Sequence, residues 1–150
     1  TALNSQAFDV WRINHGYEFF QLPDGKLAEA EGVDLIYNFP SRWWGGRIAG
    51  LVDRPNSKIF GRLFEISSKN CPIIQNKEGV TTEMSVERPI RVLVDGKEIT
   101  ATAFTTASNR VNTDGPISEK FVEALVQGAE QAGLPADYIT RLRSGALKKS

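Results

Sequence analysis

The segment RVLVDGKEIT, residues 91–100, is the clearest fold signal in the chain. Asp95 and Gly96 separate two runs in which apolar and polar residues alternate. This dipeptide is typical of a two-residue hairpin turn whose central residues have positive φ. We therefore expect residues 83–94 to form a strand that pairs antiparallel with residues 97–104. An antiparallel sheet should then form the centre of the fold.

Upstream of this hairpin the chain contains further β-branched and aromatic runs. Pro, Gly, Asn and Asp interrupt them, so each run reads as a separate strand. Residues 53–57 (DRPNS) consist almost wholly of turn formers and predict a tight loop between two strands. Strands are expected at residues 17–22, 33–38, 47–52 and 58–66. A short helix is expected over residues 4–13.

Downstream of the hairpin, residues 105–116 form a loop that is long for a compact domain without a functional reason. Ser118 caps a helix that should end at Gly133, and a second helix should follow and end at Gly145. This order of elements predicts an α+β fold, a small mixed, mainly antiparallel β-barrel with flanking helices. We expect one domain over residues 1–146 and a C-terminal tail over residues 147–150.

Composition excludes several classes of protein. The 18 Lys and Arg residues balance 18 Asp and Glu residues, so no long-range field attracts nucleic acid or an anionic membrane surface. No window reaches the roughly 18 consecutive apolar residues of a membrane span, and no signal peptide is recognisable, so a cytoplasmic protein is expected. Cys71 and His15, each the single residue of its type, predict neither a disulfide nor a metal site.

Glu78 is the candidate for acid–base chemistry. It lies in the segment KEGV, residues 77–80, after the apolar pair Ile73 and Ile74. A carboxylate at such a glycine turn can be partly buried, and desolvation then raises its pKa towards the working pH and suits it to proton transfer. A solvated turn residue explains the same pattern, and the residues alone do not separate the two interpretations.

Two further features also have alternative interpretations. The segment WWGG, residues 43–46, could stack on a ligand or could form a packed corner where backbones come close. Cys71 precedes Pro72 in an expected loop, where an incidental thiol explains it better than a reactive one.

Four segments together resemble the γ-glutamylcyclotransferase family in identity, order and spacing. They are GGRIA at 45–49, IFGRLFEI at 59–66, KEGV at 77–80, and the series from QGA at 127–129 through GLP at 133–135 to Tyr138. The resemblance implies a small barrel with a pocket at one end. It also implies a reaction that releases 5-oxoproline and a free amine from a γ-glutamyl amide, with Glu78 as general acid/base. This chemistry needs no metal or organic cofactor, and its partner is a small-molecule amide.

The same resemblance implies the substrate-binding residues. Thr1, Ala2 and Leu3 look like the end of the family's YGSNL loop, whose backbone N–H groups bind the substrate. Ser85, after Met84, stands where members often have an aromatic residue, and Phe121 stands where a Tyr is expected. These departures favour a substrate other than simple γ-glutamyl amino acids or glutathione. The expected binding residues are Thr1, Ala2, Leu3, Gly79, Met84, Ser85 and Phe121.

Two alternatives stay open at this point. If a separate N-terminal peptide completes the barrel, Thr1 could act as an N-terminal nucleophile, which would make the protein a self-processed amidase or acyltransferase on the same fold. Alternatively, the domain could be a non-catalytic module that binds a small molecule, because fold similarity does not carry activity with it.

Overall fold

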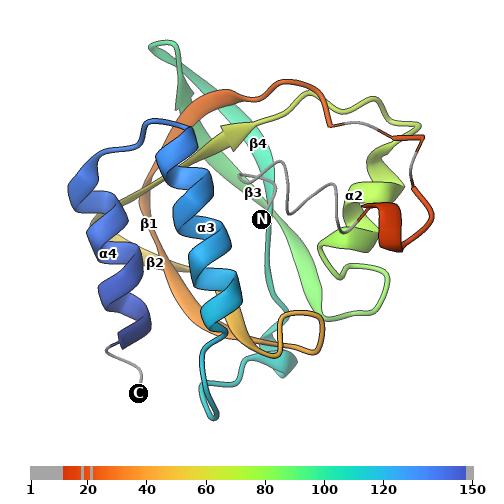
Figure 1. The fold of residues 1–150 in the computed structure, drawn as a ribbon. Helices are drawn as coiled ribbons and strands as arrows, with labels where there is room; N and C mark the ends of the chain where they lie inside the picture. Colours follow the sequence, from red (N-terminus) through yellow and green to blue (C-terminus); the bar gives the residue numbers. More distant parts are fainter. Residues whose placement is uncertain (1–11, 18, 21, 148–150) are drawn as a thin grey trace.

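The computed structural model describes residues 12–17, 19–20 and 22–147. Figure 1 shows a curved sheet with two long helices on one side and a short helix at the right of the view. The strands are β1 (Lys26–Ser41), β2 (Gly46–Leu63), β3 (Ser85–Val94) and β4 (Lys97–Thr106). The helices are α2 (Cys71–Lys77), the 3₁₀ helix η1 (Ser108–Arg110), α3 (Glu119–Gln131) and α4 (Ala136–Leu147).

The sheet has the order β2-β1-β3-β4, and its neighbouring strands are antiparallel. The hairpin expected from the segment at 91–100 is confirmed, because Val94 pairs with Lys97 across a turn with φ of 51° at Asp95 and 76° at Gly96. The mixed α+β class is therefore confirmed.

The expected barrel is not confirmed, since the described sheet is open and β2 and β4 are its edges. A side chain, rather than a backbone ladder, joins the two edges. The Thr105 hydroxyl accepts a hydrogen bond from the Leu51 N–H at 2.9 Å and donates one to the Leu51 carbonyl at 3.1 Å. The sheet thus curves strongly without closing.

The loop expected at residues 53–57 is wrong, because β2 continues through this segment as one long strand. Lys58 pairs with Glu31, and Asp53 pairs with Val33. The residues between Asp53 and Lys58 leave the ladder as a bulge while both halves of β2 stay on the same partner strand. β1 supplies that partner, although its first half shows only a weak pattern in the sequence.

The segment at 17–22 also differs from expectation, because its described residues form no strand. Tyr17 accepts a hydrogen bond from the Phe20 N–H at 3.0 Å, and Phe20 is buried against Ile73 of α2. Phe20, with Tyr17 beside it, therefore packs on a helix instead of pairing in a sheet. Residues 12–14 are helical, and the rest of the helix expected at 4–13 lies outside the described residues.

Cys71 lies at the start of α2 rather than in a loop. Pro72 occupies the first turn of this helix, where its missing N–H would have no partner in any case. The sequence pattern before Glu78 is therefore that of a short helix and not of an extended loop.

The helices after the loop begin as expected. The Ser118 side chain accepts a hydrogen bond from the Phe121 N–H at 3.1 Å and so caps α3, and Gly133 follows this helix with a φ of 71°. The second helix, however, does not end at Gly145 but continues to Leu147. The ring of Tyr37 packs against Gly145, and a glycine inside a helix costs only about 1 kcal/mol relative to alanine.

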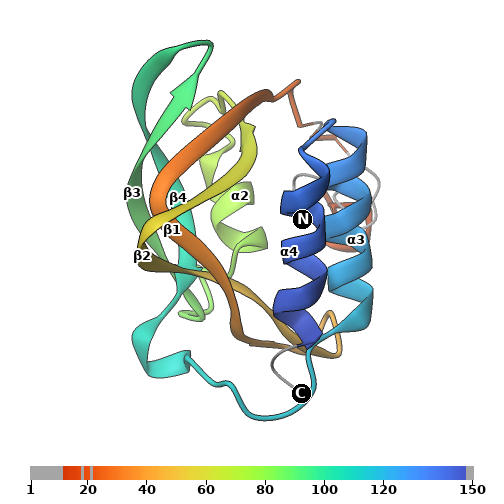
Figure 2. The same ribbon diagram turned by 90° about the vertical axis from the view of Figure 1, so that its left-hand side faces the viewer.

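The main core lies between the sheet and the pair α3 and α4, which lie side by side and face the sheet in Figure 2. Buried apolar side chains from both layers fill it, and Val126 and Ala129 are completely buried. The other buried members of this cluster are Tyr37, Phe121, Val122, Leu125, Leu134, Tyr138 and Leu142.

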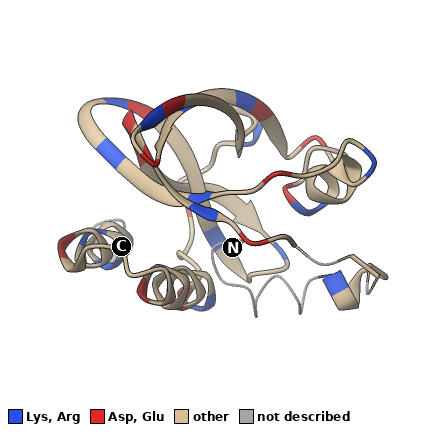
Figure 3. Cartoon of the chain, turned by 90° about the horizontal axis from the view of Figure 1, so that it is seen from above, with Lys and Arg blue, Asp and Glu red and all other residues tan. Residues whose placement is uncertain are grey.

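In Figure 3, positively charged residues (Lys and Arg) and negatively charged residues (Asp and Glu) are mixed along the strands and helices. No helix among the described residues is long and apolar enough to cross a membrane.

Candidate active site

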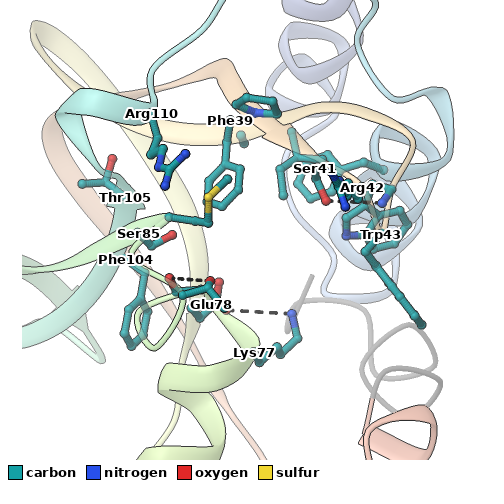
Figure 4. Close-up of a pocket in the computed structure, with 18 of the residues that line it drawn as sticks. Phe39, Ser41, Arg42, Trp43, Lys77, Glu78, Ser85, Phe104, Thr105 and Arg110 are labelled. Atoms are coloured by element: carbon teal, nitrogen blue, oxygen red, sulfur yellow. Dashed lines mark hydrogen bonds and ion pairs between the residues drawn. The ribbon is translucent and has the colours of Figure 1, made fainter.

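A cleft of about 830 Å³ opens between the end of β1, the end of α2 and the start of α3 (Figure 4). Its walls are mainly apolar and aromatic, and its polar side chains come from the ends of strands and of α2 and from the segments that connect them. The lining residues include Leu35, Phe39, Ser41, Arg42, Trp43, Trp44, Lys77, Glu78, Gly79, Met84, Ser85, Phe104, Thr105, Arg110 and Phe121. Every site residue expected from the sequence that the structure describes lies in this cleft.

Glu78 is the C-cap residue of α2, and its backbone N–H donates to the Ile74 carbonyl at 2.9 Å. Its side chain is 31% exposed, so the expected partial burial is found. The Lys77 ammonium lies 3.9 Å from Glu78 Oε1, and the Lys77 side chain is 7% exposed. A shielded carboxylate and an ammonium therefore share one wall of the cleft.

Gly79 fixes the backbone that carries Glu78. It has a φ of +86°, and a Cβ at this position would lie 3.3 Å from Met84 Cβ and 3.5 Å from Ser85 Oγ. The Gly79 carbonyl accepts hydrogen bonds from the N–H groups of Met84 at 2.9 Å and Ser85 at 3.1 Å. Only glycine adopts this conformation at little cost with neighbours so close.

The remaining expected binding residues have different surroundings. Ser85 is buried and Met84 is half-buried, and both lie next to the Gly79 turn. Phe121 is buried and forms the deep wall, where its ring meets Trp44 edge-on at a centroid distance of 5.4 Å. Residues 1–3, the other expected contacts, lie outside the described residues.

Each of the two tryptophans fits one of the two interpretations of the segment WWGG. Trp44 packs into a corner, since its carbonyl accepts a hydrogen bond from the Ser118 hydroxyl at 2.7 Å. Gly46 allows this approach, because a Cβ there would lie 2.8 Å from the Ser118 backbone nitrogen. Trp43 is 48% exposed at the mouth of the cleft, beside the ring of His15. It offers a free aromatic face to a ligand.

Phe39, Arg42, Thr105 and Arg110 are among the lining residues that sequence reasoning did not single out. For Thr105 and Arg110 the signal was the unusual length of the segment that contains them. Phe39 lies near the end of β1 and Arg42 lies in the turn after it, and only the fold reveals that both line the cleft. Within the described part of the chain, no three His, Cys, Asp or Glu side chains are grouped so as to hold a metal ion.

A family model described as the AIG2-like family matches residues 58–142, which include α2, Glu78, α3 and the first part of α4. The chain belongs to this AIG2-like family. The expected resemblance to γ-glutamylcyclotransferases is also confirmed by two relatives of that name. The Bos taurus protein is 30% identical over 140 residues, 91% of this chain and 65% of its own length. The Homo sapiens protein is 27% identical over 105 residues, 69% of this chain and 54% of its own length. This AIG2-like chain thus spans between about half and two thirds of those relatives.

Solved structures share the fold of this AIG2-like protein. A γ-glutamyl cyclotransferase structure aligns with a TM-score of 0.76 at 21% identity and covers 95% of this chain and 82% of that chain. YkqA from Bacillus subtilis aligns with a TM-score of 0.79 at 14% identity and covers 97% of this chain and 51% of that chain. The open antiparallel sheet with flanking helices is therefore the cyclotransferase fold.

Proposed function

We propose that this AIG2-like protein is a γ-glutamylcyclotransferase-like enzyme that acts on γ-glutamyl amides, with Glu78 as general acid/base. The observation that carries the proposal is the partly shielded Glu78 carboxylate on the wall of a cleft of about 830 Å³. Membership of the family and the names of its relatives support the same reaction.

The reaction suits a single carboxylate. The α-amine nitrogen of the glutamyl group attacks its own γ-carbonyl carbon, which forms the C–N bond of a five-membered lactam and breaks the amide C–N bond. Glu78 accepts the proton that the α-amine loses and delivers it to the leaving nitrogen. The products are 5-oxoproline and a free amine, and the proton count balances without any other reagent.

Much of the rate enhancement would come from holding the substrate in a folded conformation. Orienting an intramolecular attack can lower the barrier by several kcal/mol, up to about 7–11 in ideal cases. We assign this task to the walls next to Glu78, namely Gly79, Met84, Ser85 and Phe121, and to the backbone N–H groups of residues 1–3. Because Phe121 is buried and packed against Trp44, it gives the folded substrate a rigid surface.

Product analysis tests the proposal directly. Incubation of the wild-type protein with a panel of γ-glutamyl amides should yield 5-oxoproline and the free amine. Glu78→Gln should lower the rate by roughly 10²- to 10⁴-fold, the usual contribution of a general acid/base. Glu83→Gln is the matched control, because Glu83 is exposed in the same turn and does not line the cleft. It should leave the rate unchanged.

Two outcomes would count against the proposal. Absence of 5-oxoproline from the whole panel, with binding of an amide still measurable by calorimetry, would favour a non-catalytic binding module. Equal activity of wild-type and Glu78→Gln proteins would remove Glu78 from the reaction.

A further inference from the structure

The cleft carries more positive charge than the proposed chemistry uses. Three of its lining residues are cationic, Arg42, Lys77 and Arg110, and one is acidic, Glu78. Lys77 is placed beside Glu78, 3.9 Å from its carboxylate. Neither Arg42 nor Arg110 forms an ion pair with any described residue. Two guanidinium groups at an apolar cleft are therefore available to an anionic ligand.

Arg110 is the better placed of these two guanidinium groups. A chain of backbone hydrogen bonds ties it to the turn that holds Glu78. The Gly79 carbonyl accepts from the Met84 N–H at 2.9 Å, the Met84 carbonyl accepts from the Ala107 N–H at 2.9 Å, and the Ala107 carbonyl accepts from the Arg110 N–H at 2.8 Å. The position of η1 is thus fixed relative to the proton-carrying residue.

The two arginines lie on different sides of the cleft. Figure 4 shows Arg110 near Ser85 and Thr105, and Arg42 near Trp43. Arg42 belongs to the short turn between β1 and β2 and has no comparable link to the Glu78 turn: its carbonyl accepts from the Gly45 N–H at 3.3 Å. Of the two arginines, Arg110 is therefore the one more closely linked to the turn that holds Glu78.

We propose that Arg110 is a specificity-determining residue that binds an anionic group, such as a carboxylate, on the amine half of the substrate. The inference rests on the proposed function. Since Glu78 must reach the leaving nitrogen, a substituent attached to that nitrogen lies close to the wall that Glu78 and Arg110 share. The aromatic residues Phe39 and Trp43 line the same cleft and favour an amine half that also has an apolar body. An amine half with one apolar and one anionic group could contact the aromatic residues and Arg110 at the same time.

Two matched probes separate charge from shape. The γ-glutamyl amide of 4-(aminomethyl)benzoic acid and that of the corresponding carboxamide, 4-(aminomethyl)benzamide, differ in the charge of the amine half and hardly in size. The wild-type protein should release 5-oxoproline from the carboxylate probe with a kcat/KM higher by roughly 10- to 100-fold, the effect of one hydrogen bond to a charged group. Arg110→Gln should remove most of this ratio, and Arg110→Lys should retain part of it.

Lys97→Gln is the charge control. It removes one positive charge next to the β3–β4 turn, outside the cleft, and should leave the kcat/KM ratio of the two probes unchanged. Arg110→Glu should lower the ratio below that of Arg110→Gln, because a carboxylate there repels the anionic probe.

The possible results separate this inference from the proposed function. Release of 5-oxoproline from both probes with the same ratio in wild-type and Arg110→Gln proteins would overturn the role of Arg110 alone. No 5-oxoproline from either probe or from the wider panel would overturn the proposed reaction and the role of Arg110 together. A ratio that collapses in Arg110→Gln and partly returns in Arg110→Lys would support it.

Discussion

The core beneath α3 and α4 and the cleft around Glu78 are built in different ways. In the core, side chains such as Val126 and Ala129 are completely buried, and apolar packing holds the layers together. In the cleft, Glu78 stays 31% exposed and its position is set by backbone turns and short hydrogen bonds. The fold therefore derives its stability mainly from one region and places its reactive group in the other. A change in one region should be separable from a change in the other, except where a residue belongs to both.

Phe121 is such a residue, and its removal should give the largest effect on stability. It lines the cleft and belongs to the core, where its ring meets those of Tyr37 and Trp44. Phe121→Ala should lower the free energy of unfolding by about 3–5 kcal/mol, the usual cost of truncating a buried Phe. Chemical denaturation measures this loss. Phe19→Ala is the matched control, because Phe19 is 74% exposed and should change stability by no more than about 0.5 kcal/mol. Similar losses in the two variants would contradict the division into core and cleft.

A pH titration should affect the core rather than the cleft. Burial, with a smaller contribution from Tyr138, raises the pKa of Tyr37 from its ordinary value of 10.0 to about 12. Between these two values the unfolded chain loses a proton that the folded chain keeps, so ionisation favours unfolding. The contribution of Tyr37 to stability should be complete below pH 10 and should fall by roughly 3 kcal/mol as the pH rises through 12, at about 1.4 kcal/mol for each unit of pKa.

Denaturation of wild-type and Tyr37→Phe proteins from pH 8 to 12 checks this expectation. The variant should be less stable at pH 8, because it loses the hydrogen bond from the Tyr37 hydroxyl to the Leu142 carbonyl. Its stability should also fall less steeply between pH 10 and 12. Parallel curves for the two proteins would mean that Tyr37 does not ionise on unfolding.

The cleft can be perturbed through its backbone, with a smaller expected loss of stability. Gly79→Ala places a Cβ near Met84 at a φ of +86° and should lower the free energy of unfolding by about 1–2 kcal/mol. Because the same turn holds Glu78, the release of 5-oxoproline should fall as well. Gly61→Ala is the control, since a Cβ there meets nothing within 4 Å. A Gly79→Ala protein with full activity would show that the turn does not position Glu78.

Local signals in the sequence predicted much of the core and part of the site. The Asp95–Gly96 turn and the Ser118 cap depend on a few neighbouring residues, so the hairpin and α3 could be located correctly. Residues 53–57 could not, because the same turn formers allow either a chain reversal or a bulge. The outcome there depends on the distant partner strand β1, with which both halves of β2 pair. The aromatic run at 17–22 likewise depends on Ile73, which lies far along the chain.

The site shows the same division between local and distant information. Glu78 stood out because its neighbours form a recognisable motif, and its place beside Met84 and Ser85 follows from one short turn. Arg110 has no motif of its own. Its position depends on hydrogen bonds that join η1 to the segment before β3, about twenty residues upstream in the sequence.

The Thr105 hydroxyl also bears on self-association. Bare N–H and C=O groups along an edge strand are a template on which another polypeptide can add a strand and begin to aggregate. At Leu51 both backbone groups are hydrogen-bonded to the molecule's own Thr105, so this position of the β2 edge offers an incoming strand neither a donor nor an acceptor. The Thr105 hydroxyl in the cleft wall thus also disfavours the addition of a strand from another molecule at this position.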